Sequence, residues 1–404
     1  MTEYKPLRGL RMLDLTRAMA GPFCTMILGD LGADITKVEP LAGDMTRTFA
    51  PRTPDGSSAY FLSANRNKRS ICLDYRSQEG LDVLARLAEN ADVVVENFRP
   101  GVMESIGLSY AELSQRDPSV IMASVSGYGR GGPYEDWPGV DQIAQGMSGM
   151  MYVTGNEQTG PLRTGLPIAD ITTGMWTAIG VLSAALDRKT TGVGQHVHTS
   201  LLGGALGLMT MEGQRYLSTG ELPRGAGNDH PMVSPYGVFE AKDGPLVIGG
   251  GVQKRWLSLC EAIGRPELAT RPDYVDNVQR VKNRAALTAE LNTTLRHQDR
   301  AYWIERLIAA GVPTGPVLNM DKVVEDPHVQ ASGRLVVTQH PTLGALQQIA
   351  TPICFGDSLG IAEYAPPPLL GQHSVEILEQ AGLSGEDIAG LLARGTVVQS
   401  QETA

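Results

Sequence analysis

Paired cysteines, excess positive charge and long apolar runs are missing from this chain, and each absence excludes a class of protein. The 4 cysteines among 404 residues lie far apart, which argues against a disulfide framework or a zinc site and predicts buried thiols in a reducing compartment. A formal net charge of −10 argues against nucleic-acid binding. No apolar run approaches a membrane span, and the first residues lack the apolar core of a secretory signal. We therefore expect a cytoplasmic protein without metal, nucleic-acid or membrane partners.

The fingerprints of several common enzyme classes are absent too. The first expected strand enters its helix through Arg17–Pro22, which lacks the glycine pattern G-x-G-x-x-G of dinucleotide-binding proteins. The sequence contains no P-loop, no G-x-S-x-G elbow and no H-E-x-x-H motif. A helix that begins after a parallel strand still favours an anionic ligand at its N-terminus.

What the sequence does contain, in its N-terminal third, is an alternation of short apolar strands and amphipathic helices. This alternation is typical of an α/β protein with a parallel sheet covered by helices on both faces. The strands are expected at 11–16, 34–38, 70–75, 93–96 and 120–125.

The second half of the chain reads differently. From Asp141 to Leu217 the pattern is mostly helical, and a linker rich in glycine and proline follows at 218–235. Next come an expected hairpin and then three helices, at 253–263, 277–296 and 300–310, which together indicate a small α+β domain.

Cations gather where ligands bind in such sheets. Asn65–Ser70 carries Arg66, Lys68 and Arg69 just before a strand, and Lys37, Arg76 and Arg99 stand near the ends of neighbouring strands. A charged loop of this kind is most often only solvated. Strand ends of a parallel sheet also bind phosphorylated ligands, so a phosphate cradle is the second interpretation.

Asp170 stands in the segment Gly165–Gly174, immediately before a long expected helix. Aspartate commonly caps a helix N-terminus, which is the structural interpretation. A carboxylate at that position is also expected to stay ionised and can serve as a covalent nucleophile. Spacing alone leaves both interpretations open.

Several segments resemble the class III CoA-transferases, the superfamily of formyl-CoA transferase, carnitine CoA-transferase and α-methylacyl-CoA racemase. The resemblance runs in order along nearly the whole chain. The matching segments are Met12–Pro22, Leu31–Arg47, Asn65–Tyr75, Val95–Gly101, Ala169–Arg188, Thr191–Leu202 and Pro366–His373.

For the fold, the resemblance implies a large domain with an open Rossmann-like parallel sheet, formed by residues 1–217 and 326–404. A linker and a small α+β domain occupy residues 218–325. Two subunits of the family thread through each other, so an interlocked homodimer is expected.

For the site, the resemblance implies that Asp170 forms the covalent acyl intermediate. Coenzyme A enters as a thioester substrate, and no permanently bound cofactor is expected. With the strand-end cation Lys37 included, the expected coenzyme A-binding residues are Met19, Ala20, Lys37, Leu73, Asp74, Tyr75, Arg76, Asn97, Phe98 and Arg99.

Departures from the family pattern narrow the reaction. Val140 stands where the racemases carry a histidine base, which argues against an acyl-CoA racemase or isomerase. The glycine run of formyl-CoA transferases is missing from Gly225–Pro231, which weakens an oxalate specificity. The sequence motifs are most similar to those of succinyl-CoA:glutarate-type enzymes, which implies an acyl-CoA donor and a short dicarboxylic acid acceptor. Arg47 or Arg163 is the expected partner of the acceptor's remote carboxylate. Val140, which matches an active-site tyrosine of the formyl-CoA transferases, is the third expected substrate residue. A silent CoA-binding protein stays open as a third class.

Overall fold

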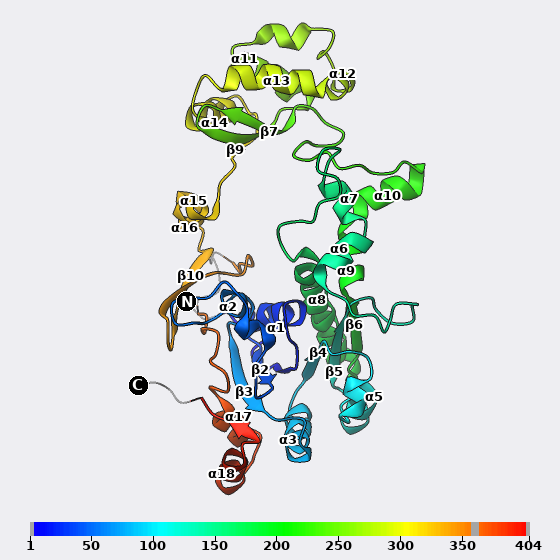
Figure 1. Cartoon of the computed structure of the whole chain (residues 1–404), viewed down its shortest axis with the longest axis vertical. Coiled ribbons are helices and arrows are strands. Elements are labelled where there is room, and N and C mark those ends of the chain that lie inside the picture. Colours follow the sequence, from blue (N-terminus) through cyan, green and yellow to red (C-terminus); the bar gives the residue numbers. More distant parts are fainter. Residues whose placement is uncertain (1–3, 357–362, 401–404) are drawn as a thin grey trace. The chain divides into compact units, whose positions relative to one another are not determined.

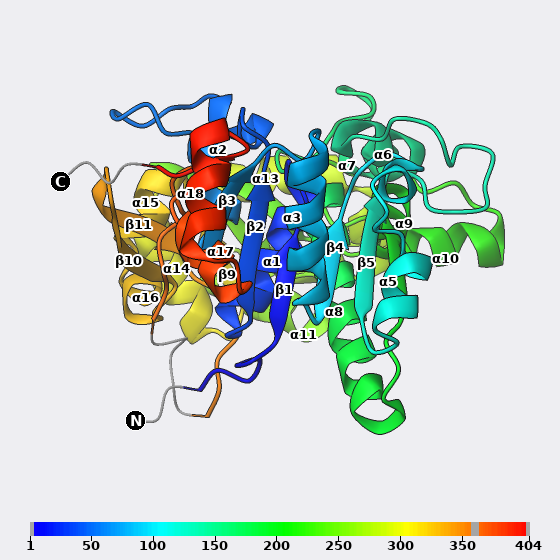
Figure 2. The same ribbon diagram turned by 90° about the horizontal axis from the view of Figure 1, so that it is seen from below.

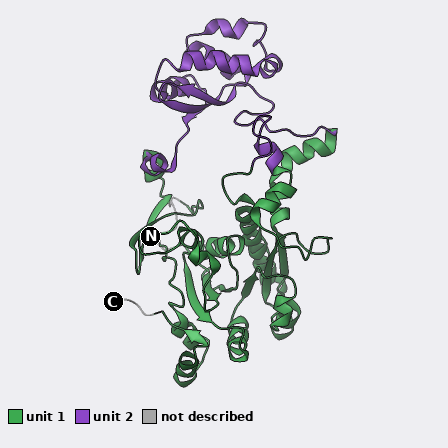
Figure 3. Ribbon diagram, in the orientation of Figure 1, with its two compact units in different colours: residues 1–150, 163–219, 327–404 green, residues 151–162, 220–326 purple. Residues whose placement is uncertain are grey.

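The computed structural model describes residues 4–356 and 363–400, and the chain divides into two compact units (Figure 3). Unit 1 comprises the described residues of 1–150, 163–219 and 327–404, and unit 2 comprises 151–162 and 220–326. The segment 151–162, which we expected in the large domain, therefore belongs to the smaller unit.

Unit 1 is built on a 7-stranded sheet in the order β12-β3-β2-β1-β4-β5-β6. All neighbouring strands are parallel except β12, which pairs antiparallel with β3 at one edge. The prediction of an α/β fold with a largely parallel sheet is confirmed. The strands are β1 (Arg11–Asp14), β2 (Asp34–Glu39), β3 (Lys68–Leu73), β4 (Val93–Glu96), β5 (Ile121–Ser126), β6 (His196–Ser200) and β12 (Val397–Val398).

Strand β6 lies inside the stretch that we expected to be mostly helical. Its sequence, HVHTS, has a single apolar residue, Val197, and none of its residues is buried. It occupies the edge of the sheet, where a strand needs no continuous apolar run. The sequence signal was therefore too polar to be recognised.

Helices cover both faces of this sheet (Figure 2). On one face lie α1 (Ala20–Asp30) and α8 (Ile168–Thr191), which pack against each other. On the other face lie α3 (Gln78–Glu89), α5 (Tyr110–Arg116) and α17 (Ser374–Gln380).

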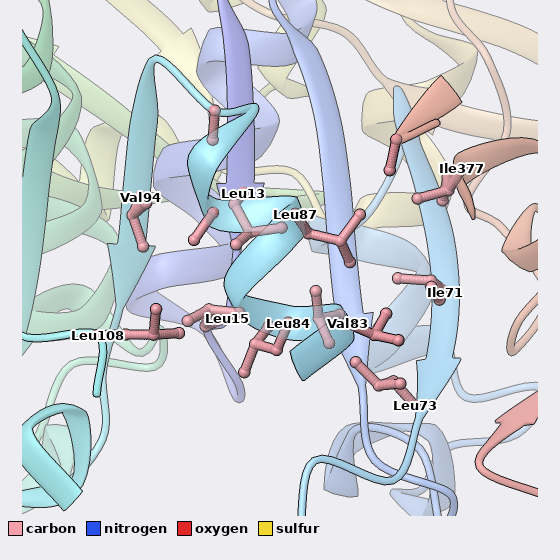
Figure 4. Close-up of a cluster of buried hydrophobic side chains, with 14 of the residues drawn as sticks. Leu13, Leu15, Ile71, Leu73, Val83, Leu84, Leu87, Val94, Leu108 and Ile377 are labelled. Carbon is pink, nitrogen blue, oxygen red and sulfur yellow. The ribbon is translucent and has the colours of Figure 1, made fainter. Parts of the chain in front are cut away.

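The core on the α3 face shows why this helix forms where it does. The Ser77 side chain accepts a hydrogen bond from the Gly80 amide and caps the helix, and Leu84 and Leu87 then face the sheet. They pack against Leu13 and Val94 of the strands (Figure 4). Each fully buried leucine contributes roughly 1.5–3 kcal/mol to stability.

Helix α8 is, by length and composition, apolar enough to cross a membrane, contrary to our expectation for the chain. In unit 1 it packs against α1, α9 (Leu201–Leu208), β5 and β6. A core helix of a globular domain can have the same length and composition, so these two properties alone are weak evidence for a membrane span.

Unit 2 contains a 3-stranded antiparallel sheet and the expected hairpin. The expected helix at 277–296 is broken at Asn283, whose side chain donates hydrogen bonds to the Gln279 and Asp273 carbonyls. The elements are β7 (Tyr236–Ala241), β8 (Gly244–Gly249), α11 (Gln253–Ala262), η2 (Pro266–Thr270), α12 (Asn277–Lys282), α13 (Arg284–Leu295), α14 (Arg300–Ala309), β9 (Thr314–Pro316) and α15 (Met320–Glu325).

The shorter elements complete both units (Figure 1). Three of the cysteines are buried as expected, but Cys354 is exposed. The remaining elements are η1 (Met45–Thr48), α2 (Ala59–Ala64), α4 (Val102–Ser105), α6 (Asp141–Met147), α7 (Met150–Thr154), α10 (Thr210–Thr219), α16 (Pro327–Ala331), β10 (Leu335–His340), β11 (Gly344–Ile349) and α18 (Gly385–Arg394).

Candidate active site

The strand order of unit 1 reverses between β1 and β4. From β1 the chain continues to β2 and β3 on one side, whereas β4, β5 and β6 lie on the other. Open α/β sheets bind ligands outside the carboxyl ends of the strands at such a switch point. The loops that leave β1 and β4 therefore define the candidate coenzyme site.

Arg17 lies at this switch point and was missed by the sequence interpretation. Its amide donates to Asn97 Oδ1 at 2.9 Å, and Asn97 Nδ2 donates to the Arg17 carbonyl at 2.8 Å, which joins the two loops. The Arg17 guanidinium donates to the Tyr75 hydroxyl and lies 5.4 Å from the Phe98 ring centroid. The arginine thus stands among expected coenzyme residues from β3 and β4. Its neighbours in the chain, Met19 and Ala20, were named on the resemblance alone.

The other expected coenzyme residues differ in exposure. Met19, Ala20 and Leu73 are buried. Asp74, Tyr75, Asn97 and Phe98 are half-buried, and Arg76 and Arg99 are exposed.

Lys37 does not fit a phosphate-binding role. Its side chain is wholly buried, and Nζ donates to the Thr16 carbonyl at 2.8 Å and to Asp44 at 3.0 Å. A second buried lysine, Lys68, is paired with Asp14 at 3.1 Å. Burial alone would raise the pKa of Asp14, but Lys68 and Lys37 hold it well below its usual range. The structure therefore corrects the expectation for Lys37, which is a buried structural cation beneath the loop that follows β1.

The two candidate acceptor arginines lie in different surroundings. Nε and Nη2 of Arg47 donate to the two carboxylate oxygens of Glu39, both at 2.7 Å. The fork of Arg47 is thereby occupied by the chain's own carboxylate. Arg163 is exposed in the loop before α8, and Val140 is exposed immediately before α6.

A cavity of about 400 Å³ lies at the carboxyl ends of β4 and β5 and beside the first half of β6. It is large enough for part of a small-molecule ligand. Phe98 and Arg99 line it together with Tyr110, Arg130 and His198, whereas Asp170 does not. The cavity therefore adjoins the expected coenzyme residues rather than Asp170.

Asp170 lies in the first turn of α8, two residues after its start. The N-cap position is taken by Pro167, so Asp170 is not the cap that its structural interpretation required. Its half-buried carboxylate receives no hydrogen bond from any residue of the described ranges 4–356 and 363–400. The side chain is therefore not committed to a structural contact within the described chain.

Asp141, at the start of α6, caps α8 instead. Its Oδ1 accepts hydrogen bonds from the amides of Ala169, at 2.8 Å, and Asp170, at 3.3 Å. Pro167 offers no side-chain cap, so this contact satisfies amides that the local sequence leaves open. The two partners lie 28 and 29 residues from Asp141, and no local pattern indicates such a contact.

The surroundings of Asp170 change its acidity. Burial raises the pKa of Asp170 to about 7, and the negative charge of Asp141 adds to the rise. We expected the helix N-terminus to keep this group ionised, but desolvation and the second carboxylate outweigh that effect. Burial, with Asp170 and Asp141 nearby, also raises the pKa of Tyr60 to about 12, so a neutral phenol faces the same carboxylates.

Known proteins are similar to this chain in both sequence and architecture. A family model described as CoA-transferase family III matches residues 7–374. Succinyl-CoA:glutarate CoA-transferase of Homo sapiens is 35% identical over 404 residues, which covers 100% of this chain and 92% of that protein. Acetyl-CoA:oxalate CoA-transferase of Acetobacter aceti is 40% identical over 344 residues, covering 83% and 88%. The crystal structure of a CAIB/BAIF family protein from Brucella suis superposes with a TM-score of 0.86 at 36% identity, covering 94% of this chain and 100% of that one.

Proposed function

Because the chain belongs to CoA-transferase family III, we propose that it moves coenzyme A from an acyl-CoA donor to a short dicarboxylic acid through a covalent intermediate on Asp170. The observation that carries this proposal is the state of the Asp170 carboxylate. It receives no hydrogen bond from the described residues, and burial beside Asp141 raises its pKa to about 7. A basic carboxylate without donors is a stronger nucleophile than an ordinary surface aspartate.

The proposed reaction balances without an oxidant or a metal. An Asp170 oxygen attacks the donor thioester, the C–S bond breaks, and coenzyme A leaves as a thiolate with a mixed anhydride on the enzyme. The thiolate attacks the Asp170 carbonyl, which releases the donor acid and leaves an aspartyl-CoA thioester. The acceptor carboxylate attacks this thioester to form a second anhydride, and the thiolate then takes the acceptor acyl group. Water must be excluded during these steps, because anhydrides hydrolyse.

We place the coenzyme at the switch point between β1 and β4. Arg17 is half-buried there against Tyr75 and Phe98, and Arg76 and Arg99 add exposed positive charge. These cations suit the phosphates of coenzyme A. No cofactor beyond the coenzyme thioester itself is proposed.

For the acceptor we propose a dicarboxylate, because the names of both relatives described above include one, glutarate or oxalate. A buried remote carboxylate needs a cation, because an unpaired charge is costly to desolvate. Arg163 is preferred over Arg47 for this role, since Glu39 already occupies the Arg47 fork.

Incubation with succinyl-CoA and a panel of free acids is expected to produce new thioesters, detected by mass spectrometry. Glutarate is expected to be a better acceptor than oxalate. The variant Arg163→Met should raise the KM for glutarate several-fold without changing the KM for succinyl-CoA. Transfer to oxalate alone would indicate an oxalate-type enzyme. A changed stereocentre without a new thioester would indicate an isomerase, and binding without turnover a silent CoA-binding protein.

We also propose that the chain forms the interlocked homodimer implied by its family. Helix α8 exposes large apolar side chains, which on a monomer would face water. They are Met175, Trp176, Ile179 and Leu186, with exposures of 44% to 70%. Sedimentation velocity is expected to show a dimer that persists on dilution, because threaded chains separate only by unfolding. A monomer at low nanomolar concentration would contradict this.

A further inference from the structure

We propose that Gln145 is a positioning residue for the transfer reaction: through Asp141 it controls how readily Asp170 gains and loses its proton. The inference rests on the proposed role of Asp170 as nucleophile. Gln145 is wholly buried on α6, one helical turn after Asp141. It touches neither α8 nor the Asp170 carboxylate by any hydrogen bond among the described residues, so its effect must pass through Asp141 and the loop before α8.

The hydrogen bonds of Gln145 leave its amide only one orientation. Nε2 donates to Asp141 Oδ2 at 2.7 Å and to the Leu166 carbonyl at 3.2 Å, and both of these partners can only accept. Oε1 accepts from the Thr164 amide at 3.0 Å, a group that can only donate. If the amide were flipped, Oε1 would face two acceptor oxygens and Nε2 would face the Thr164 amide, so none of these three hydrogen bonds could form. Gln145 therefore locks α6 to the loop that leads into the nucleophile.

The locked amide holds the Asp141 carboxylate in one position. With Oδ2 bound by Gln145, Oδ1 is directed at the amides of Ala169 and Asp170. The negative charge of Asp141 is thereby fixed beside the first turn of α8. This charge is the second cause, after burial, of the raised pKa of Asp170. If Asp141 were mobile, the distance between its charge and the Asp170 carboxylate would vary.

Other ionisable groups near α8 do not explain the effect. Besides Asp141, the group that faces Asp170 is Tyr60 on α2, whose raised pKa keeps it neutral. Helix α9 and strand β5, which also pack against α8, carry no ionisable side chain. The remaining candidates on packed elements, none of which shifts the pKa of Asp170, are Cys24 and Asp30 on α1 and His196 and His198 on β6.

Two isosteric replacements are expected to move the acid limb of the pH profile in opposite directions. Asp141→Asn removes a negative charge beside Asp170, so its ionisation becomes easier and the limb moves to lower pH. Gln145→Glu adds a negative charge, so the limb moves to higher pH. Each shift is expected to be on the order of one pH unit, a tenfold change in the ionised fraction. The measurement is kcat against pH with succinyl-CoA and glutarate.

The double variant Asp141→Asn with Gln145→Glu tests the direction of the hydrogen bond. The new side-chain amide at position 141 would donate to position 145, the reverse of the native contact. The new carboxylate at position 145 would accept from that amide and from the Thr164 amide. Asp141→Asn alone sets the new amide against the Gln145 amide that donates to this position, so kcat is expected to fall in that variant. The swapped pair is expected to recover at least about fivefold of this loss, which converts to roughly 1 kcal/mol of coupling. A purely structural role for Gln145 predicts no recovery, because the Leu166 carbonyl still lacks its donor.

Gln142→Glu is the matched control, since Gln142 is exposed on the same helix and the same charge is added there. The acid limb of the pH profile of Gln142→Glu is expected to stay within about 0.3 pH unit of that of the wild type, because solvent screens exposed charges. The proposal is overturned if Asp141→Asn and Gln145→Glu both leave the limb unmoved or move it in the same direction. If Gln145→Glu does not fold by circular dichroism, the swap decides: no gain over Asp141→Asn overturns the proposal.

Intact-mass measurement with succinyl-CoA alone separates this inference from the proposed function. If the wild type forms an adduct but the variants at Asp141 and Gln145 leave the acid limb unmoved, only the proposed role of Gln145 is refuted. Absence of any adduct on the wild type would sink the covalent role of Asp170 itself.

Discussion

Asp170→Ala is expected to lower kcat for transfer by about 10⁴-fold or more, the scale of loss when a covalent nucleophile is removed. No other carboxylate can take over, because Asp141 is held by the amides of α8 and by Gln145. Steady-state transfer from succinyl-CoA to glutarate measures the loss. The mass of the protein after incubation with the donor should show no adduct.

The matched control is Asp187→Ala, an exposed aspartate on the same helix, which should keep activity within about twofold. Stability separates lost chemistry from lost fold. The folded pKa of Asp170 lies above its unfolded value, so its contribution is present at low pH and is lost as pH rises through about 7. Asp170→Ala should therefore unfold at a higher temperature than wild type at pH 8. Retention of even a few per cent of turnover would refute the covalent scheme.

Arg17→Met is expected to raise the KM for acyl-CoA by roughly 10- to 100-fold, the range for a lost charge-assisted hydrogen bond to phosphate. The reason is its place at the switch point, half-buried against Tyr75 and Phe98. Calorimetric titration with free coenzyme A measures the same change without turnover.

Arg17→Lys keeps the charge and should recover part of the affinity, whereas a stacking role alone predicts no recovery. Arg116→Met removes an exposed arginine whose partner is Glu89 and serves as the control, with affinity unchanged. An affinity of Arg17→Met within twofold of wild type would remove Arg17 from the coenzyme site.

The parallel sheet could be predicted because its central strands are continuous apolar runs. β4 consists of VVVE and is buried on both faces, a pattern that can be recognised without any knowledge of its neighbours. The edge strands gave no such signal. β6 is polar and half-exposed, and β12 has only 2 residues, held by pairing with β3. Edge strands depend on the sheet that they join, so their own sequence carries little information.

The candidate site was predictable only where a motif names a residue. Asp170 was found through its segment, but Asp141 and Gln145 act across chain separations of about 20 to 30 residues, as the contacts to Leu166 and Ala169 show. Lys37 was misjudged for a related reason. A lysine near a strand end is expected to be exposed, and only the folded chain shows Asp44 buried beside it.

Helix α8 follows a proline that cannot cap it with a side chain, and Asp141 of α6 supplies the cap instead. This arrangement ties the proposed reactivity of Asp170 to a local unfolding equilibrium. If α6 detaches while the sheet stays intact, water reaches Asp170, the second carboxylate moves away, and the proposed nucleophile becomes an ordinary surface acid. The opened state would still pass as folded by most spectroscopic probes, yet it would be poorly reactive. Hydrogen exchange at the Ala169 amide reports this opening directly, so that amide measures the fraction of molecules competent for transfer.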